Sequence, residues 1–372
     1  MATRVLQFGT SRFLQAHADL FIHEASASGQ DIGPITVVKT TQGAERAGRI
    51  AAFADPAGFP VRIRGLSGGH VVDAEVRVKS VALAYDAYLN WDQLQDRFSC
   101  QTEVVICNTA EAGYTVPEQD RQPSTATGSV PSSFPAKLLR LLVCRHRSNP
   151  APLLILPCEL IVNNGQYLRG ILSDLAADWG LGAGFLEWFA RDVTICDTLV
   201  DRIVSEALEP IGAIAEPYAL WAIRRSPGMV EPFQHPNVVY TENLETYTRL
   251  KLHILNLGHT WLAELWRSTG RAPNETVREI LSDAAVRNAL LSLYRDEVVP
   301  GFAAHELRAE ATRYIAQTIE RFDNPFLNHR ISDIAQNHAP KIQSRVGDFL
   351  SWVASAEPSL TLPRLRQLAG SV

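Results

Sequence analysis

The chain has 372 residues, of which 46% are hydrophobic and 20% are charged, a composition typical of a folded globular protein rather than a disordered one. Its length exceeds that of one ordinary compact core, so two domains are expected. The 35 basic and 40 acidic residues give a net charge of −5, which argues against nucleic acid as a partner but allows a small anionic substrate.

The sequence also predicts a cellular compartment. No stretch reaches the roughly 18 apolar residues that a membrane-spanning helix needs, and the first residues lack the pattern of a secretory signal. The five cysteines are scattered and odd in number, so they suggest neither a disulfide framework nor a zinc cluster. We therefore expect a cytoplasmic protein with free thiols, no membrane partner and no metal site.

The first half of the chain alternates short apolar runs with an amphipathic segment. An expected strand over residues 4–8 is followed by a glycine turn, an expected helix over 12–27 and a second strand over 34–40. This order is the βαβ unit of a parallel sheet. Apolar runs at 103–107 and 152–156 fit further strands that are buried on both faces of that sheet.

Other segments complete the predicted architecture. Alternation and glycine turns over residues 59–85 predict an inserted β-hairpin. Residues 122–132 are expected to form a loop, after which Ser133 can cap a helix. Beyond residue 195, helices are expected at 199–208, 246–268, 275–294, 305–321 and 341–355. The predicted class is α/β, with a Rossmann-like doubly wound domain at 1–195 that carries the hairpin and a mainly α-helical domain at 196–372.

The turn after the first strand lies where a dinucleotide fingerprint belongs. It runs Gly9, Thr10, Ser11, Arg12 and Phe13. Glycines there permit a tight turn and let backbone N–H groups approach a pyrophosphate at the helix N-terminus. Only the first glycine is present, so an ordinary strand-to-helix turn is an equally good interpretation of these residues alone.

The sequence leaves the choice of coenzyme open. The second strand ends at Thr40 without the acidic residue that would bind the ribose 2′-hydroxyl of NAD. Arg46 or Arg49 could meet the 2′-phosphate of NADP, although a solvated helix face is the more ordinary place for both.

Lys251, Asn256 and His259 form the most suggestive cluster in the second half. At about 100° per residue, they share one broad polar face of an expected helix. A partly desolvated lysine can carry a proton to or from a substrate oxygen, and a neutral amide can hydrogen-bond a developing alkoxide. The trio therefore suits hydride transfer at a carbon–oxygen bond. An alternative is a half-exposed helix with unconnected polar residues, and His253 shows that histidine also occurs off this face.

With these pieces in place, the chain resembles the mannitol dehydrogenase family, the polyol-specific long-chain dehydrogenases, from about residue 6 to residue 345. Lys251, Asn256 and His259 match its Lys-x4-Asn-x2-His catalytic motif. The resemblance is closest to the tagaturonate reductase (altronate oxidoreductase) branch. The matching stretches are 63–66, 108–113, 133–137, 156–160, 198–203, 216–217, 321–326 and 333–337, followed by Lys341 and Arg345.

The resemblance implies a metal-free mechanism with Lys251 as general acid/base and Asn256 at the oxyanion. It implies NAD(H) at Phe8 to Phe13 and near Asn108 and Thr109, with Thr40 close to the adenosine ribose. The residues expected to contact the substrate are Asp201, Arg202, Lys341 and Asn163. Asn163 or Asn164 is considered as a second hydrogen-bond donor to the oxyanion, because Leu160 occupies the position at which the mannitol-oxidising branch has an asparagine.

The sequence thus supports one leading hypothesis and two alternatives. The leading one is an NAD-dependent reductase that interconverts a keto sugar acid and its hydroxy acid, similar to tagaturonate and altronate. The first alternative is a dehydrogenase of neutral polyols or of a polyol phosphate. The second is a dinucleotide-binding sensor that has lost catalysis, which the sparse glycine turn favours and the intact trio opposes.

Overall fold

The computed structural model describes residues 4–43, 47–109, 111–122 and 129–370. The chain forms two compact units. Unit 1 comprises Met1–Ile63, Ala74–Ala215 and Ala219–Leu244, and unit 2 comprises Arg64–Asp73, Glu216–Tyr218 and Glu245–Val372. The division differs from the boundary expected after residue 195, because five strands beyond that point belong to unit 1. Within the described ranges, no helix is both long and apolar enough to cross a membrane.

A six-stranded parallel sheet forms the centre of unit 1 and confirms the predicted doubly wound domain. Its order is β5-β2-β1-β6-β7-β8, so the chain reverses its direction of travel across the sheet between β1 and β6. Ligands of such sheets bind outside the carboxyl ends of the strands at this reversal. The strands are β1 (Val5–Phe8), β2 (Ile35–Lys39), β5 (Val81–Asp86), β6 (Val104–Cys107), β7 (Leu153–Pro157) and β8 (Val193–Ile195).

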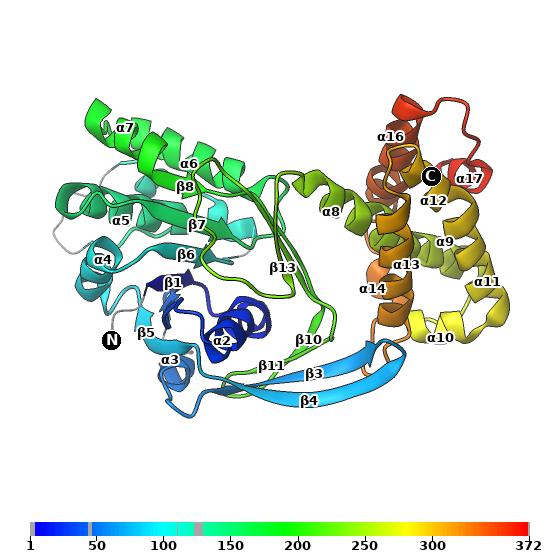
Figure 1. Cartoon of the computed structure of the whole chain (residues 1–372), viewed down its shortest axis with the longest axis horizontal. Helices are drawn as coiled ribbons and strands as arrows, with labels where there is room; N and C mark the ends of the chain where they lie inside the picture. Colours follow the sequence, from blue (N-terminus) through cyan, green and yellow to red (C-terminus); the bar gives the residue numbers. More distant parts are fainter. Residues whose placement is uncertain (1–3, 44–46, 110, 123–128, 371–372) are drawn as a thin grey trace. The chain divides into compact units, whose positions relative to one another are not determined.

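Helices cover both faces of this sheet (Figure 1). Neighbouring residues of one strand contribute to different cores, since Val5 packs with the helix that follows β1 and Leu6 packs with α4 to α7. Ser133 caps α5 as expected, accepting a hydrogen bond from Ala136 N. The helices are α1 (Arg12–Leu14), η1 (Gln15–Asp19), α2 (Leu20–Ala27), α3 (Ala47–Phe53), α4 (Trp91–Cys100), α5 (Phe134–Ser148), α6 (Asn164–Asp178) and α7 (Ala183–Asp192).

The segments α1, η1 and α2 follow one another as a single helix, and η1 is a π-helical turn that ends at Asp19. Asp19 is completely buried, and this burial raises the pKa of its carboxyl well above the usual range. The folded chain therefore keeps a proton that the unfolded chain releases near the ordinary pKa. The stability contributed by this group is complete below the ordinary pKa and is lost as the pH rises toward the raised pKa.

Replacing Asp19 with asparagine removes this pH-dependent loss. We expect the free energy of unfolding of D19N, relative to the native chain, to rise as the pH increases from acidic to alkaline. Urea unfolding at a series of pH values measures the difference. D174N, at an exposed position of α6, is the control, and a D19N difference that stays constant with pH would contradict the expectation.

The region after β8 contains strands where the sequence analysis expected a helix. The helix expected at 199–208 is wrong, because Val200 and Val204 lie in extended segments that pair in sheets. A three-stranded sheet has the order β13-β12-β9. A four-stranded sheet has the order β10-β11-β3-β4, in which β3 spans Phe59–Ser67 and β4 spans His70–Val78. The strands are β9 (Thr198–Asp201), β10 (Val204–Ala207), β11 (Ala213–Ala215), β12 (Leu220–Arg224) and β13 (Val238–Thr241).

The predicted hairpin is present as β3 (Phe59–Ser67) and β4 (His70–Val78), which turn at Gly68 and Gly69. It ends earlier than expected, because residues 81–86 leave it and join the parallel sheet as β5. The loop expected at 122–132 lies partly outside the described residues, since 123–128 are not described.

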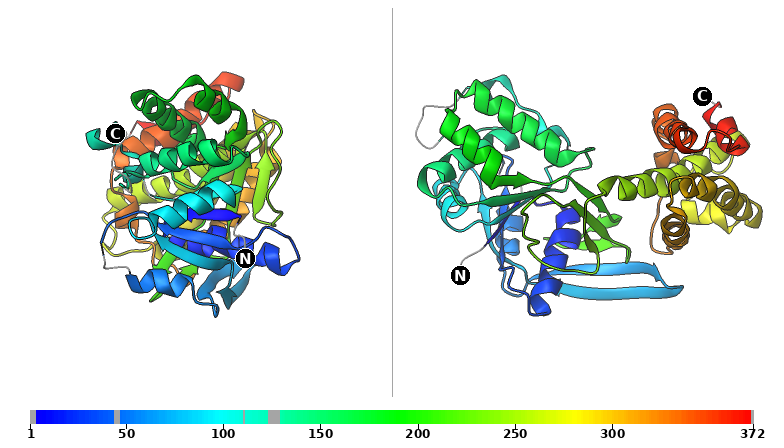
Figure 2. Two further views of the ribbon diagram at one scale, coloured as in Figure 1. Left: turned by 90° about the vertical axis from the view of Figure 1, so that its left-hand side faces the viewer. Right: turned by 45° about the horizontal axis from the view of Figure 1, so that its top comes forward.

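Unit 2 is mainly helical (Figures 1 and 2). Its helices share one apolar core. The helices expected at 246–268, 275–294, 305–321 and 341–355 are confirmed, with interruptions. The segments are α8 (Leu244–Leu250), η5 (Lys251–Asn256), α9 (Leu257–Thr269), α10 (Val277–Ser282), α11 (Ala284–Leu293), η6 (Tyr294–Val298), α12 (Val299–Ala303), α13 (Arg308–Phe322), α14 (Ile331–Ile334), α15 (His338–Ile342), η7 (Gln343–Gly347), α16 (Asp348–Ala356) and α17 (Pro363–Ala369).

The hairpin tip packs within unit 2 against the end of α13. Asn324 donates a hydrogen bond of 3.2 Å to Arg64 O, and a Cβ on Gly65 would lie 2.5 Å from Pro217. Beside them, Arg321 forms a bidentate pair with Glu216, at 2.8 and 3.1 Å, with both side chains buried. Three of the stretches that carry the family resemblance therefore meet here and build the fold of unit 2.

Candidate active site

The glycine turn closes directly onto the end of β6. Gly9 has φ = +113°, and a Cβ at this position would lie 2.5 Å from Asn108 O. Asn108 N in turn donates a 3.0 Å hydrogen bond to Phe8 O. A side chain at residue 9 is therefore excluded both by backbone conformation and by space, which explains why this one glycine of the fingerprint is present.

A chain of side-chain hydrogen bonds joins the carboxyl ends of three strands. Ser11 Oγ accepts from Leu14 N at 3.2 Å, which caps the helix, and donates to Asn108 Oδ1 at 3.1 Å. Asn108 Nδ2 donates to Cys158 O at 2.7 Å. The turn after β1 is thus fixed to the ends of β6 and β7. Two residues expected to bind the cofactor, Ser11 and Asn108, are brought into contact.

These residues fit a dinucleotide. The first turn of a helix presents backbone N–H groups that have no partner within the helix, and its positive dipole end favours a pyrophosphate. Thr10, Ser11 and Phe13 are partly exposed and Arg12 is exposed at this turn, while Phe8 and Gly9 are buried beneath it.

The end of β2 lies in the same sheet. Thr40 follows β2 and is partly exposed. Lys39, the last residue of the strand, pairs with Asp86 at 2.6 Å. Arg49 Nη2 donates to Thr10 O at 3.4 Å. Arg46, the other arginine considered for a 2′-phosphate, lies outside the described residues.

Replacing Gly9 with alanine is expected to weaken NADH binding about 10-fold or more, because the Cβ would strain the turn and push it away from Asn108. Quenching of protein fluorescence by NADH measures the dissociation constant. Gly170 in α6 is a matched control, since a Cβ there would meet no atom within 4 Å. Equal affinities of G9A and G170A would remove the turn from the nucleotide site.

Glu159 is a buried carboxyl beside this turn that the sequence analysis did not select. Its Oε1 accepts from Thr109 N at 2.9 Å and its Oε2 accepts from Tyr114 OH at 2.9 Å. Burial raises the pKa of this carboxyl. Glu159 thereby holds the segment after β6, including the expected cofactor residue Thr109. The available signal was an acidic residue shortly after an apolar strand.

The expected substrate residues of unit 1 differ in their surroundings. Asn164 is fully buried and its amide bonds to Pro157 O, Glu159 O and Thr198 N, so it supports the fold. Asn163 is exposed and has φ = +51° just before α6. Of the two asparagines, Asn163 alone presents its side chain to solvent.

Asp201 is the last residue of β9, Arg202 follows it, and both are buried. Arg202 Nη1 donates to Ala16 O at 2.6 Å, in the π-helical turn η1. This bond fixes part of the guanidinium to the helix that follows the glycine turn.

Lys251 and Asn256 open and close the π-helical turn η5. At α-helical spacing, the two residues would share one broad face but lie about 140° apart around the axis. A π-turn is bonded from residue i to residue i+5, so Asn256 lies one turn above Lys251. Both side chains are partly exposed. The turn therefore brings these two predicted catalytic residues onto the same side of the helix.

Contacts from other helices of unit 2 hold this π-turn. Tyr294 OH donates to Ile254 O at 2.9 Å, and a Cβ on Gly258 would lie 2.0 Å from the Tyr294 oxygen. The absence of a side chain at Gly258 therefore permits the close approach of Tyr294. On another side, His253 Nδ1 bonds to Arg345 O at 3.0 Å, and burial lowers the pKa of His253 to about 4. His253 is a neutral histidine of the core.

His259 lies in the first turn of α9 and is buried. Its ring packs against Phe322 at 4.6 Å and against His329 at 4.8 Å between centroids. The third member of the trio is therefore held firmly in place.

Two cations lie on the helix formed by α15 and η7. Lys341 donates to Ile334 O at 2.8 Å. Arg345 Nη1 donates to Asn256 O at 3.2 Å and to Thr260 Oγ1 at 3.0 Å. Lys341 was expected from the sequence, whereas the contact of Arg345 with the π-turn was not. Their spacing of four residues on one helix was the available signal.

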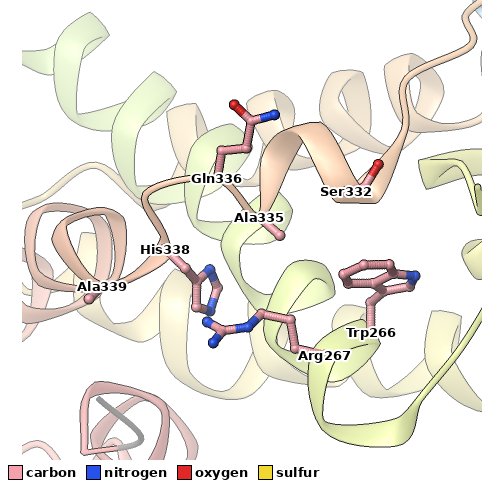
Figure 3. Close-up of a pocket in the computed structure, with 7 residues that line it drawn as sticks. All are labelled: Trp266, Arg267, Ser332, Ala335, Gln336, His338 and Ala339. Atoms are coloured by element: carbon pink, nitrogen blue, oxygen red, sulfur yellow. The ribbon is translucent and has the colours of Figure 1, made fainter. Parts of the chain in front are cut away.

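Unit 2 also contains a surface pocket at the far end of α9 (Figure 3). In the close-up, the Arg267 side chain extends toward His338, while Trp266 lies on the opposite side of the pocket from the histidine. His338 is bonded to Glu264 at 2.8 Å. The residues of the trio do not line this pocket.

Comparison with known proteins identifies the family. A model of the mannitol dehydrogenase Rossmann domain matches residues 65–232, and a model of the mannitol dehydrogenase C-terminal domain matches residues 243–361. Altronate oxidoreductase of Halalkalibacterium halodurans is 30% identical over 365 residues, covering 92% of this chain and 69% of that protein. Altronate oxidoreductase of Bacillus subtilis (strain 168) is 27% identical over 367 residues, covering 92% and 73%.

Solved structures support the same fold. D-sorbitol dehydrogenase in substrate-free form has a TM-score of 0.76 at 15% identity, covering all of this chain and 86% of that one. Mannitol 2-dehydrogenase of Pseudomonas fluorescens, in a ternary complex with NAD and D-mannitol, has a TM-score of 0.70 at 16% identity, covering 100% and 84%. With matches to both of its domains along most of its length, the chain belongs to the mannitol dehydrogenase family.

Proposed function

We propose that this protein is an NAD-dependent oxidoreductase that interconverts a keto sugar acid and its hydroxy acid, with tagaturonate and altronate as the substrate pair. The observation that carries the proposal is the match to altronate oxidoreductases over 92% of the chain. The matched region contains Lys251, Asn256 and His259 at the family's motif spacing.

The bound coenzyme would accept a hydride as NAD+ when the alcohol is oxidised and would donate one as NADH when the carbonyl is reduced. The turn from Phe8 to Phe13 would hold the pyrophosphate at the helix N-terminus. Asn108 and Thr109, fixed by Ser11 and Glu159, would line the nucleotide at the reversal of the sheet. Thr40, at the end of β2, would lie near the adenosine ribose.

Lys251 would act as the general acid and base at the substrate oxygen. It gives a proton to that oxygen when the carbonyl is reduced and takes the proton when the alcohol is oxidised. Asn256, one turn above it, would donate a hydrogen bond to the same oxygen and stabilise its developing charge. His259 would hold the oxygen or a neighbouring hydroxyl. This scheme uses no metal ion.

The remaining candidates would bind the rest of the sugar. On unit 1, Asp201 and Asn163 would bind hydroxyl groups, and Arg202 would contribute beside its bond to Ala16. On unit 2, Lys341 would pair with the carboxylate or a hydroxyl.

A substrate panel tests the proposal. Absorbance of NADH should change with tagaturonate or altronate far faster than with mannitol, arabinitol or mannitol 1-phosphate, faster with NAD(H) than with NADP(H), and equally well in excess EDTA. Preference for a neutral polyol or a polyol phosphate would assign the protein to a different substrate class. Binding of NADH without turnover of any substrate would indicate a sensor.

A further inference from the structure

Among the described residues of unit 2, Arg345 lacks the carboxylate partner that other buried or part-buried arginines have. Several other part-buried or buried arginines of this unit form ion pairs with carboxylates. These pairs are Arg271–Glu275, Arg287–Asp323, Arg321–Glu216 and Arg364–Glu297. Arg345 is half-buried, yet no carboxylate of the described residues lies within ion-pair distance of it, and its protein hydrogen bonds are to Asn256 O and Thr260 Oγ1.

Within the described part of the chain, the guanidinium of Arg345 donates hydrogen bonds through one nitrogen only. Both of its hydrogen bonds leave from Nη1. Among the described residues, Nε and Nη2 therefore have no partner. Nε and Nη2 lie along one edge of the guanidinium. Such an edge can donate two parallel hydrogen bonds to a carboxylate. The contact through Nη1 fixes the orientation of this edge relative to Asn256.

A second cation reinforces the same charge. Lys341 precedes Arg345 by one helical turn and bonds only to a backbone carbonyl, Ile334 O, within the described structure. Burial, together with the charge of Arg345, lowers the pKa of Lys341, and burial lowers the pKa of Arg345 to about 10. Two like charges held together without an acid are unfavourable for folding, so an anionic ligand would relieve a cost already present in the protein.

We propose that the free edge of Arg345, with Lys341 beside it, binds the carboxylate of the substrate and selects sugar acids over neutral polyols. This inference rests on the proposed function, since it places the acid group next to the Lys251–Asn256 turn. A planar carboxylate fits the two parallel donors of Arg345, and Lys341 adds a point charge. A phosphate ester is also an anion that these cations could bind. The experiment below distinguishes it from the carboxylate.

The test compares tagaturonate with its methyl ester, which keeps the sugar and removes the charge. Calorimetric affinities and kcat/KM are measured for both compounds with the native protein, R345M and R345K. The acid-to-ester ratio is expected to fall about 10- to 100-fold in R345M and less in R345K, which keeps the charge but loses the two-donor edge. If Arg345 had only a structural role, R345M would lower the affinity and kcat/KM equally for the acid and the ester. The ratio would then be unchanged.

R267M is the matched control, because Arg267 is an exposed arginine of the same unit, and its ratio should equal that of the native protein. An unchanged ratio in R345M, or preferred binding of mannitol 1-phosphate over tagaturonate, would overturn the carboxylate assignment. Acid binding that depends on Arg345 without turnover would refute the proposed reaction and leave this inference standing. If turnover requires Lys251 but the acid-to-ester ratio of R345M equals that of the native protein, the proposed reaction stands and this inference is refuted.

Discussion

Replacing Lys251 with alanine is expected to lower kcat about 1,000-fold, within the range attributed to general acid–base catalysis. Proton transfer at the substrate oxygen loses its carrier, while Asn256 and His259 remain. The affinity for NADH should change by less than about 2-fold, because the nucleotide is assigned to residues of unit 1. Steady-state rates with tagaturonate and fluorescence titration with NADH provide the two measurements.

Arg249 offers a control for this change. It lies two residues earlier on the neighbouring helix α8, where it pairs with Glu245. R249A should keep most of its kcat. If K251A turned over substrate at a rate close to that of R249A, Lys251 would have no part in proton transfer, and the proposed mechanism would be wrong.

Replacing Arg321 with leucine is expected to lower the free energy of unfolding of unit 2 by about 3–5 kcal/mol. The change leaves the Glu216 carboxylate buried without its bidentate partner. It also removes the guanidinium from the face of the Tyr218 ring, 4.3 Å away. Hydrogen exchange followed by mass spectrometry measures the loss in each unit separately, because unit 2 should exchange faster while the central sheet of unit 1 keeps its protection.

The pair between Arg295 and Asp296 is the matched surface case. Both side chains are exposed, so R295L should cost at most about 1 kcal/mol. If R321L destabilised unit 2 no more than R295L does, the buried pair would contribute little, and another contact would have to account for the packing of the hairpin tip.

Strands β1, β2, β6 and β7 of the parallel sheet were predictable because they are short apolar runs buried on both faces, whereas β5 was assigned to the hairpin and β8 was not predicted. Strands β9 to β13 were not predictable, since each has only three to five residues and depends on partners distant in sequence. The segment 199–208 shows the limit clearly. Its spacing of apolar residues fits a helix, yet Val200 and Val204 extend because neighbouring strands offer them hydrogen bonds.

The residue types of the candidate site were predictable, but parts of its geometry were not. The spacing of Lys251, Asn256 and His259 selected the right segment, whereas the π-turn depends on Tyr294 and on other tertiary contacts that no local pattern reveals. Arg345 was named only as part of the family resemblance, because the sequence does not show that it has no carboxylate partner among the described residues. Which of these side chains take part in the reaction stays a prediction.

The path of the chain limits how this protein can be dissected. Unit 2 includes ten residues of the hairpin tip and the short segment Glu216–Tyr218, both supplied from within the part of the sequence that otherwise builds unit 1. A gene fragment ending near residue 244 would therefore express these pieces without Asn324 and Arg321, and the complementary fragment would begin without Glu216. Separate production of the two halves requires redesign of both pieces rather than a single cut.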